Sequence, residues 1–185
     1  MVKNKELTYK SVESTRITIS QLMLPSFSNF SGKIHGGYIL NLMDQIAFAC
    51  ASKHSGTYCV TASVDTVDFL NSIEVGELVS MKASINYVGR TSMVVGIRVE
   101  AENIQSGKKK HCNSSYFTMV AKDEKGRNTE VPGLIVDNEI EVKRFLKALK
   151  RIETKIERQR EFDRKDFSHV NYLEDLKDYR VRIDI

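Results

Sequence analysis

The segment from Asn29 to Asp44 brings together residue types that can act on a carbonyl group. Gly36 and Gly37 open a strongly apolar stretch that is predicted to be a helix, and Asp44 lies within it. Backbone N–H groups at the start of a helix are unpaired and lie at the positive end of the helix dipole, so they can bind an oxygen. A carboxylate on an apolar helix costs free energy unless it has a partner or a task. Together these residues predict a site that polarises a carbonyl and activates a water molecule.

Each of these residues also has a purely structural explanation. On spacing alone, Asp44 is equally well explained by a nearby cation or by the capping of a local N–H group. Asn29 could be an ordinary turn asparagine, because loops often use this residue. Gly36 and Gly37 could form only the turn into the helix, although that geometry would still leave N–H groups free. His35 could hold the loop instead of contacting a ligand.

The residues around this segment predict one long, buried central helix. Alternation from 15 to 24 indicates a β-strand, and the small, polar residues 26–36 indicate a loop. From about 37 to 53, apolar residues cover most faces of the predicted helix. Gly56 then provides a signal for the end of the helix.

After Gly56, apolar residues recur at every second position, which is the spacing of β-strands. Four such runs follow, at 58–70, 79–87, 93–101 and 111–121. The links between them are short and contain turn residues, so we expect an antiparallel meander. This order of elements predicts an α+β fold, in which an antiparallel β-sheet wraps around one central helix.

The composition is that of one ordinary domain with an appendage. Of the 185 residues, 41% are hydrophobic, which is enough for one core. We place the domain at residues 1–133 and a charged, largely helical C-terminal extension at 134–185. Within the extension, apolar residues recur every three or four positions from 137 to 166, which indicates an amphipathic helix. Residues 167–185 carry no assignment.

Charge, hydropathy and cysteine content argue against several classes of protein. The formal net charge is only +4, and no Arg-rich stripe or zinc-finger spacing indicates nucleic-acid binding. No run of about 18 or more apolar residues predicts a membrane span. Residues 1–10 lack the apolar segment of a secretory signal. The three cysteines have no metal-ligand spacing, so we expect reduced thiols, no metal site and a cytoplasmic location.

The order and spacing of several residues resemble the signature of hotdog-fold acyl-CoA thioesterases, in particular the YciA-like and brain-type acyl-CoA hydrolase group. The matching residues are Pro25, Asn29, Gly32, His35, Gly36, Gly37 and Asp44, followed by the segments 64–70, 75–77 and 89–93. The resemblance spans residues 17–132 and departs at Ser31, where many relatives carry a second asparagine. It implies the hotdog fold, hydrolysis of acyl-CoA to a free carboxylic acid and CoA, and no metal or redox cofactor.

The resemblance also implies roles for the first group of residues. Asp44 would act as a general base or as a nucleophile in thioester hydrolysis. Asn29 would orient water or donate to the thioester oxygen. Gly36 and Gly37 would form the oxyanion hole at the start of the helix.

A second candidate site is a turn between two predicted strands, formed by Gly89, Arg90, Thr91 and Ser92. Sequence alone favours a β-turn with a solvated arginine. In relatives this segment lies along the CoA, so the resemblance assigns it, together with His35, to substrate and CoA binding. An arginine side chain suits this role because its guanidinium matches phosphate oxygens.

The spacing within the first site predicts that two subunits build it. Gly36 and Asp44 are separated by about 12 Å along one helix, so one helix cannot easily place both on the same carbonyl. We therefore expect Asn29 and Gly37 from one subunit to face Asp44 from the other, in a homodimer with antiparallel helices. Three such dimers would assemble into a hexamer, as is common among the relatives.

Two other functions compete with hydrolysis. A hotdog dehydratase or hydratase acting on acyl thioesters would need a histidine and an acid to move a proton at carbon, and no histidine falls within the predicted helix. A non-catalytic acyl-CoA-binding regulator would need an attached DNA-binding module, and the extension shows no helix-turn-helix pattern.

Overall fold

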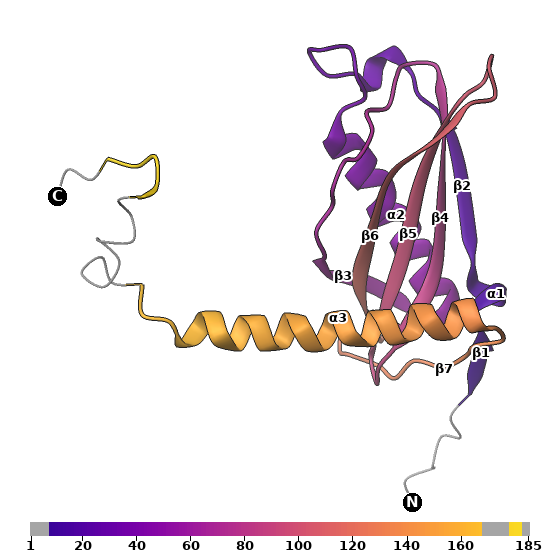
Figure 1. Cartoon of the computed structure of the whole chain (residues 1–185). Helices are drawn as coiled ribbons and strands as arrows, with labels where there is room; N and C mark the ends of the chain where they lie inside the picture. The colour runs from indigo at the N-terminus through magenta and orange to yellow at the C-terminus, as the bar shows by residue number, and fades with distance from the viewer. Residues whose placement is uncertain (1–7, 168–177, 183–185) are drawn as a thin grey trace, which may run out of the picture. The chain divides into compact units, whose positions relative to one another are not determined.

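The chain forms an antiparallel sheet, one long helix packed against it and a charged C-terminal helix (Figure 1). The structure is a computed structural model that describes residues 8–167 and 178–182. In chain order its elements are β1 (Tyr9–Ser11), α1 (Val12–Thr15), β2 (Ile17–Leu22), the 3₁₀ turn η1 (Pro25–Phe27), α2 (Gly36–Ser55), β3 (Tyr58–Val64), β4 (Glu77–Val88), β5 (Ser92–Asn103), β6 (Lys109–Lys122), β7 (Gly133–Ile135) and α3 (Glu139–Arg164).

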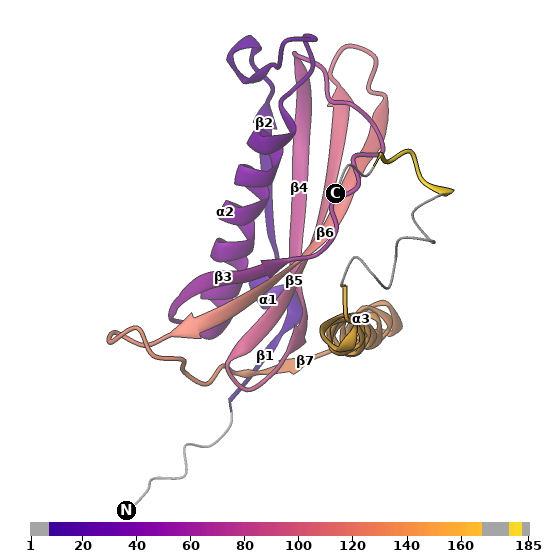
Figure 2. The ribbon, with the colours of Figure 1, turned by 90° about the vertical axis from the view of Figure 1, so that its left-hand side faces the viewer.

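The main sheet has five antiparallel strands in the order β2-β4-β5-β6-β3. Helix α2 lies against one face and contacts all five strands (Figure 2). The core between them is formed by alternate residues of the strands and by one side of the helix, because successive strand residues point to opposite faces. The predicted arrangement, an antiparallel sheet around one central helix, is confirmed.

The predicted meander is confirmed for β4, β5 and β6 and is wrong for β3. Strand β3 pairs with β6, so it forms the edge of the sheet opposite β2. The link at 65–76 is too long for a hairpin, and its first part is hydrogen-bonded to β6 through Asp65 N–H to Tyr116 O and Leu70 N–H to Cys112 O. This link leads past β6 and β5 to β4. Strands β3 and β4 are therefore consecutive in the sequence without being neighbours in the sheet.

Helix α2 is the predicted central helix, but in the single chain it is buried on one side only. Its inward residues recur at three- and four-residue steps and are Ile39, Leu42, Met43, Ile46, Ala47, Cys50, Ala51 and His54. The opposite face exposes Asn41, Asp44, Gln45 and Phe48. Gly56 ends the helix in the left-handed conformation (φ 74°), as predicted.

A second, parallel sheet of two strands, β1 and β7, was not indicated by the sequence. A Cβ atom at Gly133 would lie 2.4 Å from the Tyr9 ring, so a larger residue there would have to displace this ring. The strand predicted from 15 to 24 is confirmed as the shorter β2, and the short helix α1 precedes it. Helix α1 forms because Ser11 caps it, accepting a hydrogen bond from Ser14 N–H at 3.2 Å.

Helix α3 is the amphipathic helix predicted for the extension. One compact unit of the chain runs to Ala148 and a second begins at Leu149, whereas the sequence placed a boundary after Gly133. The first turns of α3 belong to the first unit because Glu141 is buried there and accepts a hydrogen bond from Arg16 Nη2 at 2.7 Å.

Helices long and apolar enough to cross a membrane are absent from residues 8–167 and 178–182. Several predictions concern residues that the structure does not describe. The beginning of the N-terminal segment (1–7) and parts of the extension (168–177 and 183–185) lie outside the described residues.

Candidate active site

Asp44 lies on the exposed face of α2, beside β3. Thr61 Oγ1 donates a 2.5 Å hydrogen bond to Asp44 Oδ1. Thr61 pairs with the buried Met119 and lies two residues after the buried Cys59, so regular alternation places its side chain on the face of β3 that meets α2. Sequence reasoning did not select Thr61, because a threonine in an alternating run is typical of any strand. Within the described part of the chain Asp44 forms no ion pair, so the structure gives no support to a cationic partner.

An open hollow adjoins this pair of residues, between α2 and β3. It is lined by Asp44, Gln45, Phe48, Tyr58, Cys59, Val60, Thr61 and Met119. The rings of Phe48 and Tyr58 are exposed, with their centroids 5.4 Å apart. A largely apolar wall with one carboxylate at its edge can hold an apolar ligand beside a base or a nucleophile.

Asn29 organises the loop that precedes α2. Its Oδ1 accepts hydrogen bonds from Ser31 N–H (3.0 Å), Ser31 Oγ (2.8 Å) and Lys33 N–H (3.1 Å). The side-chain oxygen is therefore used inside the loop, and the amide NH₂ is the part of Asn29 that remains to bind a ligand. Ser31, the departure from the family pattern, takes part in this local network.

The start of α2 is less open than the sequence suggested. His35 is the N-cap residue, and its Nδ1 accepts the N–H of Gly37 at 3.0 Å. Gly37 N–H is therefore occupied in this structure. At Gly36 a Cβ atom would lie 3.2 Å from the Phe69 ring, so the absence of a side chain lets that ring lie against the helix start. Gly36 remains the better candidate of the two glycines for an oxyanion contact.

The residues Gly89, Arg90, Thr91 and Ser92 form the turn between β4 and β5, with Gly89 N–H bonded to Ser92 O at 2.8 Å. Arg90 is exposed, and its Nε lies 2.9 Å from Glu130 Oε1. The structure does not bring this turn near the Asn29 loop of the same chain. The loop meets Glu74, just before β4, and the turn follows the twelve-residue β4, which spans roughly 36 Å.

The other titratable groups around α2 are poor candidates for catalysis. Burial raises the pKa of the Cys50 thiol to about 12, which keeps it protonated and unreactive. Helix α2 extends to Ser55 and contains His54, so the prediction that the central helix lacks a histidine is wrong. His54 is fully buried, with Nε2 3.0 Å from Pro132 O, and lies about 15 Å along the helix from Asp44. In the described part of the chain, no three His, Cys, Asp or Glu residues are grouped to hold a metal.

Comparison with known proteins points to one family. The family described as the thioesterase superfamily matches residues 31–108. Protein VdlD from Helicobacter pylori is 43% identical over 148 residues, which cover 80% of this chain and 84% of that protein. A hexameric acyl-CoA thioesterase, solved without ligand, is 36% identical with a TM-score of 0.80, over 83% of this chain and 98% of that one.

An acyl-CoA hydrolase from Staphylococcus aureus, solved with butyryl coenzyme A, coenzyme A and coenzyme A disulfide, is 30% identical with a TM-score of 0.77. The match covers 90% of this chain and 99% of that one. Alanine variants of that enzyme at an aspartate, an asparagine and a threonine are also similar in structure. The asparagine precedes the aspartate by 15 residues and the threonine follows it by 17, which are the spacings of Asn29, Asp44 and Thr61 here.

Proposed function

The chain belongs to the hotdog-fold acyl-CoA thioesterases of the thioesterase superfamily and is a thioester hydrolase, and from this premise we propose that Asp44 activates the hydrolysis of acyl-CoA to a free carboxylic acid and CoA. The observation that carries the proposal is the Asp44–Thr61 hydrogen bond at the edge of an open, largely apolar hollow. The matching spacings of an asparagine, an aspartate and a threonine in the Staphylococcus aureus enzyme support it.

Asp44 can act in either of two ways. As a general base, its carboxylate would take a proton from the water that attacks the thioester carbon. As a nucleophile, it would attack that carbon itself and expel the CoA thiolate, forming a mixed anhydride that water then hydrolyses to the free acid and Asp44. In both cases Thr61 fixes one carboxylate oxygen, Oδ1, and leaves Oδ2 to react. Both routes require the carbonyl oxygen to be polarised by hydrogen-bond donors.

The donors in this proposal come from the loop and the helix start. The NH₂ group of Asn29 and the N–H of Gly36 would bind the thioester oxygen as negative charge develops on it. Gly37 would contribute its N–H only if His35 released it, since His35 Nδ1 accepts that group. His35 would therefore contribute to substrate binding through Nε2 or through its hold on the helix start.

We propose that the site is completed by a second copy of the chain. Strand β3 is an edge strand, so its outer side offers unpaired backbone groups to a partner. Phe48 and Tyr58 expose aromatic surface beside Asp44, and Phe30 is fully exposed beside Asn29. A two-fold axis at this edge would cover these groups and could bring the Asn29 loop of one copy to the Asp44 hollow of the other. Three such dimers would form the hexamer.

The turn at the β4–β5 junction is our proposed contact for the CoA moiety. Arg90 would donate to phosphate oxygens, supported by the backbone and hydroxyl groups of Gly89, Thr91 and Ser92. Glu130 competes with the ligand for the Arg90 guanidinium. The proposed chemistry uses no metal or redox cofactor, as the family resemblance implies. The cysteines of the described chain are unpaired, which supports a cytoplasmic location.

The proposal is tested by following CoA release from acyl-CoA with a thiol reagent. Asp44→Asn keeps the size of the side chain but removes the base, so kcat should fall by about 10²-fold or more. If the wild-type protein releases CoA and the Asp44→Asn variant does so at nearly the same rate, Asp44 is not the active group. Tight acyl-CoA binding without CoA release by the wild type would favour the regulator, and release of water or its addition to the acyl chain would favour the dehydratase or hydratase.

A further inference from the structure

The loop that carries Asn29 is attached to the segment before β4. Asn29 N–H donates to Lys33 O (2.7 Å), and Asn29 Oδ1 accepts Lys33 N–H (3.1 Å), so Asn29 and Lys33 are held as one unit. Ile34 N–H donates to Ile73 O at 2.9 Å, and Lys33 forms a β-bridge with Glu74. The position of the Asn29 amide therefore depends on how Lys33 is held against Glu74.

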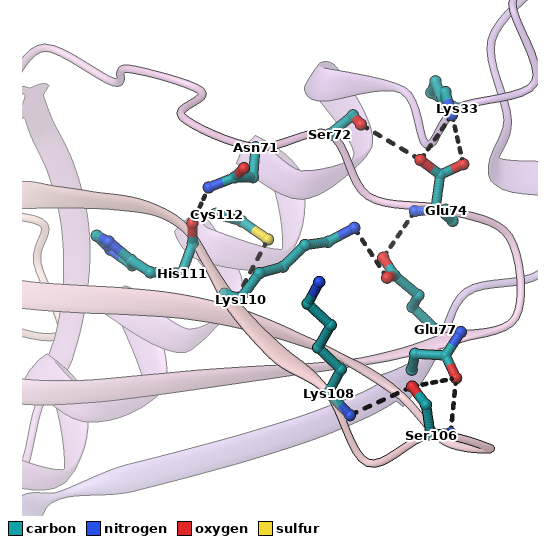
Figure 3. Close-up of polar contacts among 11 residues, drawn as sticks. Lys33, Asn71, Ser72, Glu74, Glu77, Ser106, Lys108, Lys110, His111 and Cys112 are labelled. Carbon is teal, nitrogen blue, oxygen red and sulfur yellow. Dashed lines mark hydrogen bonds and ion pairs between the residues drawn. The ribbon is translucent and has the colours of Figure 1, made fainter.

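Four charged side chains continue this attachment as far as β6, as Figure 3 shows. Lys33 Nζ lies 2.6 Å from both carboxylate oxygens of Glu74. Glu74 N–H donates to Glu77 Oε2 at 2.8 Å, and Glu77 Oε1 lies 2.8 Å from Lys110 Nζ. Hydrogen bonding from Lys33 lowers the pKa of the Glu74 carboxyl, as expected for a formed ion pair. We call Lys33, Glu74, Glu77 and Lys110 the anchoring chain.

Burial along the anchoring chain is greatest at Glu77, and Lys110 beyond it is 29% exposed. The side chains of Lys33 and Glu74 are 45% and 39% exposed, whereas that of Glu77 is 8% exposed. An exposed pair alone contributes little, but a buried carboxylate that loses its cation leaves an uncompensated charge. Because Glu77 also accepts Glu74 N–H, the loss of Lys110 would disturb the backbone that holds the Asn29 loop.

We propose that the anchoring chain positions the Asn29 amide for the thioester carbonyl, so that its members act on catalysis through Asn29 without touching substrate. The inference rests on the proposed function, in which Asn29 donates to that oxygen. Displacement of a reacting group by about 1 Å can cost up to about 10²-fold in rate. An interaction that matters in the transition state alone lowers kcat and leaves KM nearly unchanged.

The test uses the full-length Lys33→Met variant, which removes the charge and keeps a long side chain. We expect kcat to fall about 10-fold and KM to change by less than about 2-fold. In an Asn29→Ala background the same substitution should have no further effect, because no amide remains to be positioned. The matched control is Lys109→Met. Lys109 Nζ lies 3.2 Å from Glu102 Oε2 on the β5–β6 hairpin, and Lys109 is not part of the anchoring chain. The kcat of the Lys109→Met variant should therefore stay at the wild-type value.

Reversal of the exposed pair, Lys33→Glu with Glu74→Lys, should recover most of the lost kcat. Lys110→Met removes the cation that pairs with the buried Glu77, and if that variant fails to fold, Lys33→Met decides. Wild-type kcat in Lys33→Met, or a loss that persists in full without the Asn29 amide, would overturn the inference. Neither result touches the proposed function, which fails separately if Asp44→Asn retains turnover.

Discussion

The Asp44–Thr61 contact fixes how the proposed reacting carboxylate is presented. Thr61 Oγ1 donates to Oδ1 at 2.5 Å and also lies 3.4 Å from Met119 Sδ. A carboxylate held by one oxygen loses rotational freedom, so less has to be ordered in the transition state. At the scale of single residues, Thr61 is therefore the strongest new candidate for a role beside Asp44.

Thr61→Val should lower kcat by about 10-fold with little change in KM, because it removes the hydroxyl donor and leaves the strand residue β-branched. Steady-state kinetics with one acyl-CoA would measure this change. Thr61→Ser is the matched control and should keep most of the activity, since it retains the hydroxyl. Equal losses in the Val and Ser variants would indicate that packing of the methyl group, not the hydrogen bond, is what matters.

Arg90→Ala should raise KM for acyl-CoA more than it lowers kcat, because a phosphate contact is made in both the ground state and the transition state. The effect should shrink with acyl-pantetheine, which lacks the nucleotide. Glu130→Gln serves as the companion variant: it frees the guanidinium from its ion pair and should not raise KM. Equal KM increases for Arg90→Ala with both substrates would place Arg90 away from the CoA.

Residue types and spacing made Asp44 and Asn29 candidates, because a carboxylate on an apolar helix and an asparagine in a glycine-containing loop have recognisable chemistry. Their proposed roles came from the family resemblance, since spacing alone also allowed structural explanations. The same signals could not reveal Thr61, because alternation gives the face of β3 on which it lies but not its position opposite Asp44. They also could not reveal that His35 occupies Gly37 N–H, because a cap depends on the rotamer of one side chain.

At the scale of elements, the C-terminal end of α2 is held by hydrogen bonds from Lys10 and by a contact between His54 and Pro132. Lys10 Nζ donates to the carbonyl oxygens of Lys53 and His54, at 3.1 and 2.8 Å, which satisfies two free carbonyls of the last turn. His54 Nε2 lies 3.0 Å from Pro132 O, and its Nδ1 is buried without a partner in the described structure. Burial lowers the pKa of His54, so the folded chain holds this imidazole neutral.

This lowered pKa predicts how stability depends on pH. Below the unfolded value of about 6.5, the unfolded chain binds a proton that folded His54 resists, so the free energy of unfolding should fall as pH decreases. Above that value the contribution is fully present. His54→Gln, which can still donate to Pro132 O, should show a shallower loss between about pH 7 and 5. Denaturant titrations at one protein concentration would measure both proteins, and parallel curves would contradict the assignment.

The main sheet shows that a sequence can predict where strands lie along the chain better than which strands pair. Period-two alternation located β4, β5 and β6 closely, and turn residues linked them correctly as hairpins. Alternation carries no information on which edge a strand joins, so β3 was placed beside β4 when it pairs with β6. The exposed face of α2 was not predicted either, since apolar residues cover most faces of this helix in the sequence.

At the scale of the whole molecule, the single chain leaves its proposed site unfinished. The Asn29 loop and the Asp44 hollow lie at different heights along α2, and the edge strand β3 and the aromatic residues beside it are exposed. Sequence spacing predicted this separation, because a distance along one helix follows from residue number alone. The way two copies meet follows from three-dimensional surfaces, which no spacing rule supplies.

The shared site is the central claim of this account, and subunit mixing tests it most directly. Asn29→Ala and Asp44→Ala homo-oligomers should each be nearly inactive. After dissociation and joint reassembly, each heterodimer should hold one intact site and one doubly damaged site and recover roughly half of the wild-type turnover. Affinity tags of two kinds would verify the heterodimers. Recovery of CoA release is the predicted result, and its absence in verified heterodimers would show that each site is built from a single chain.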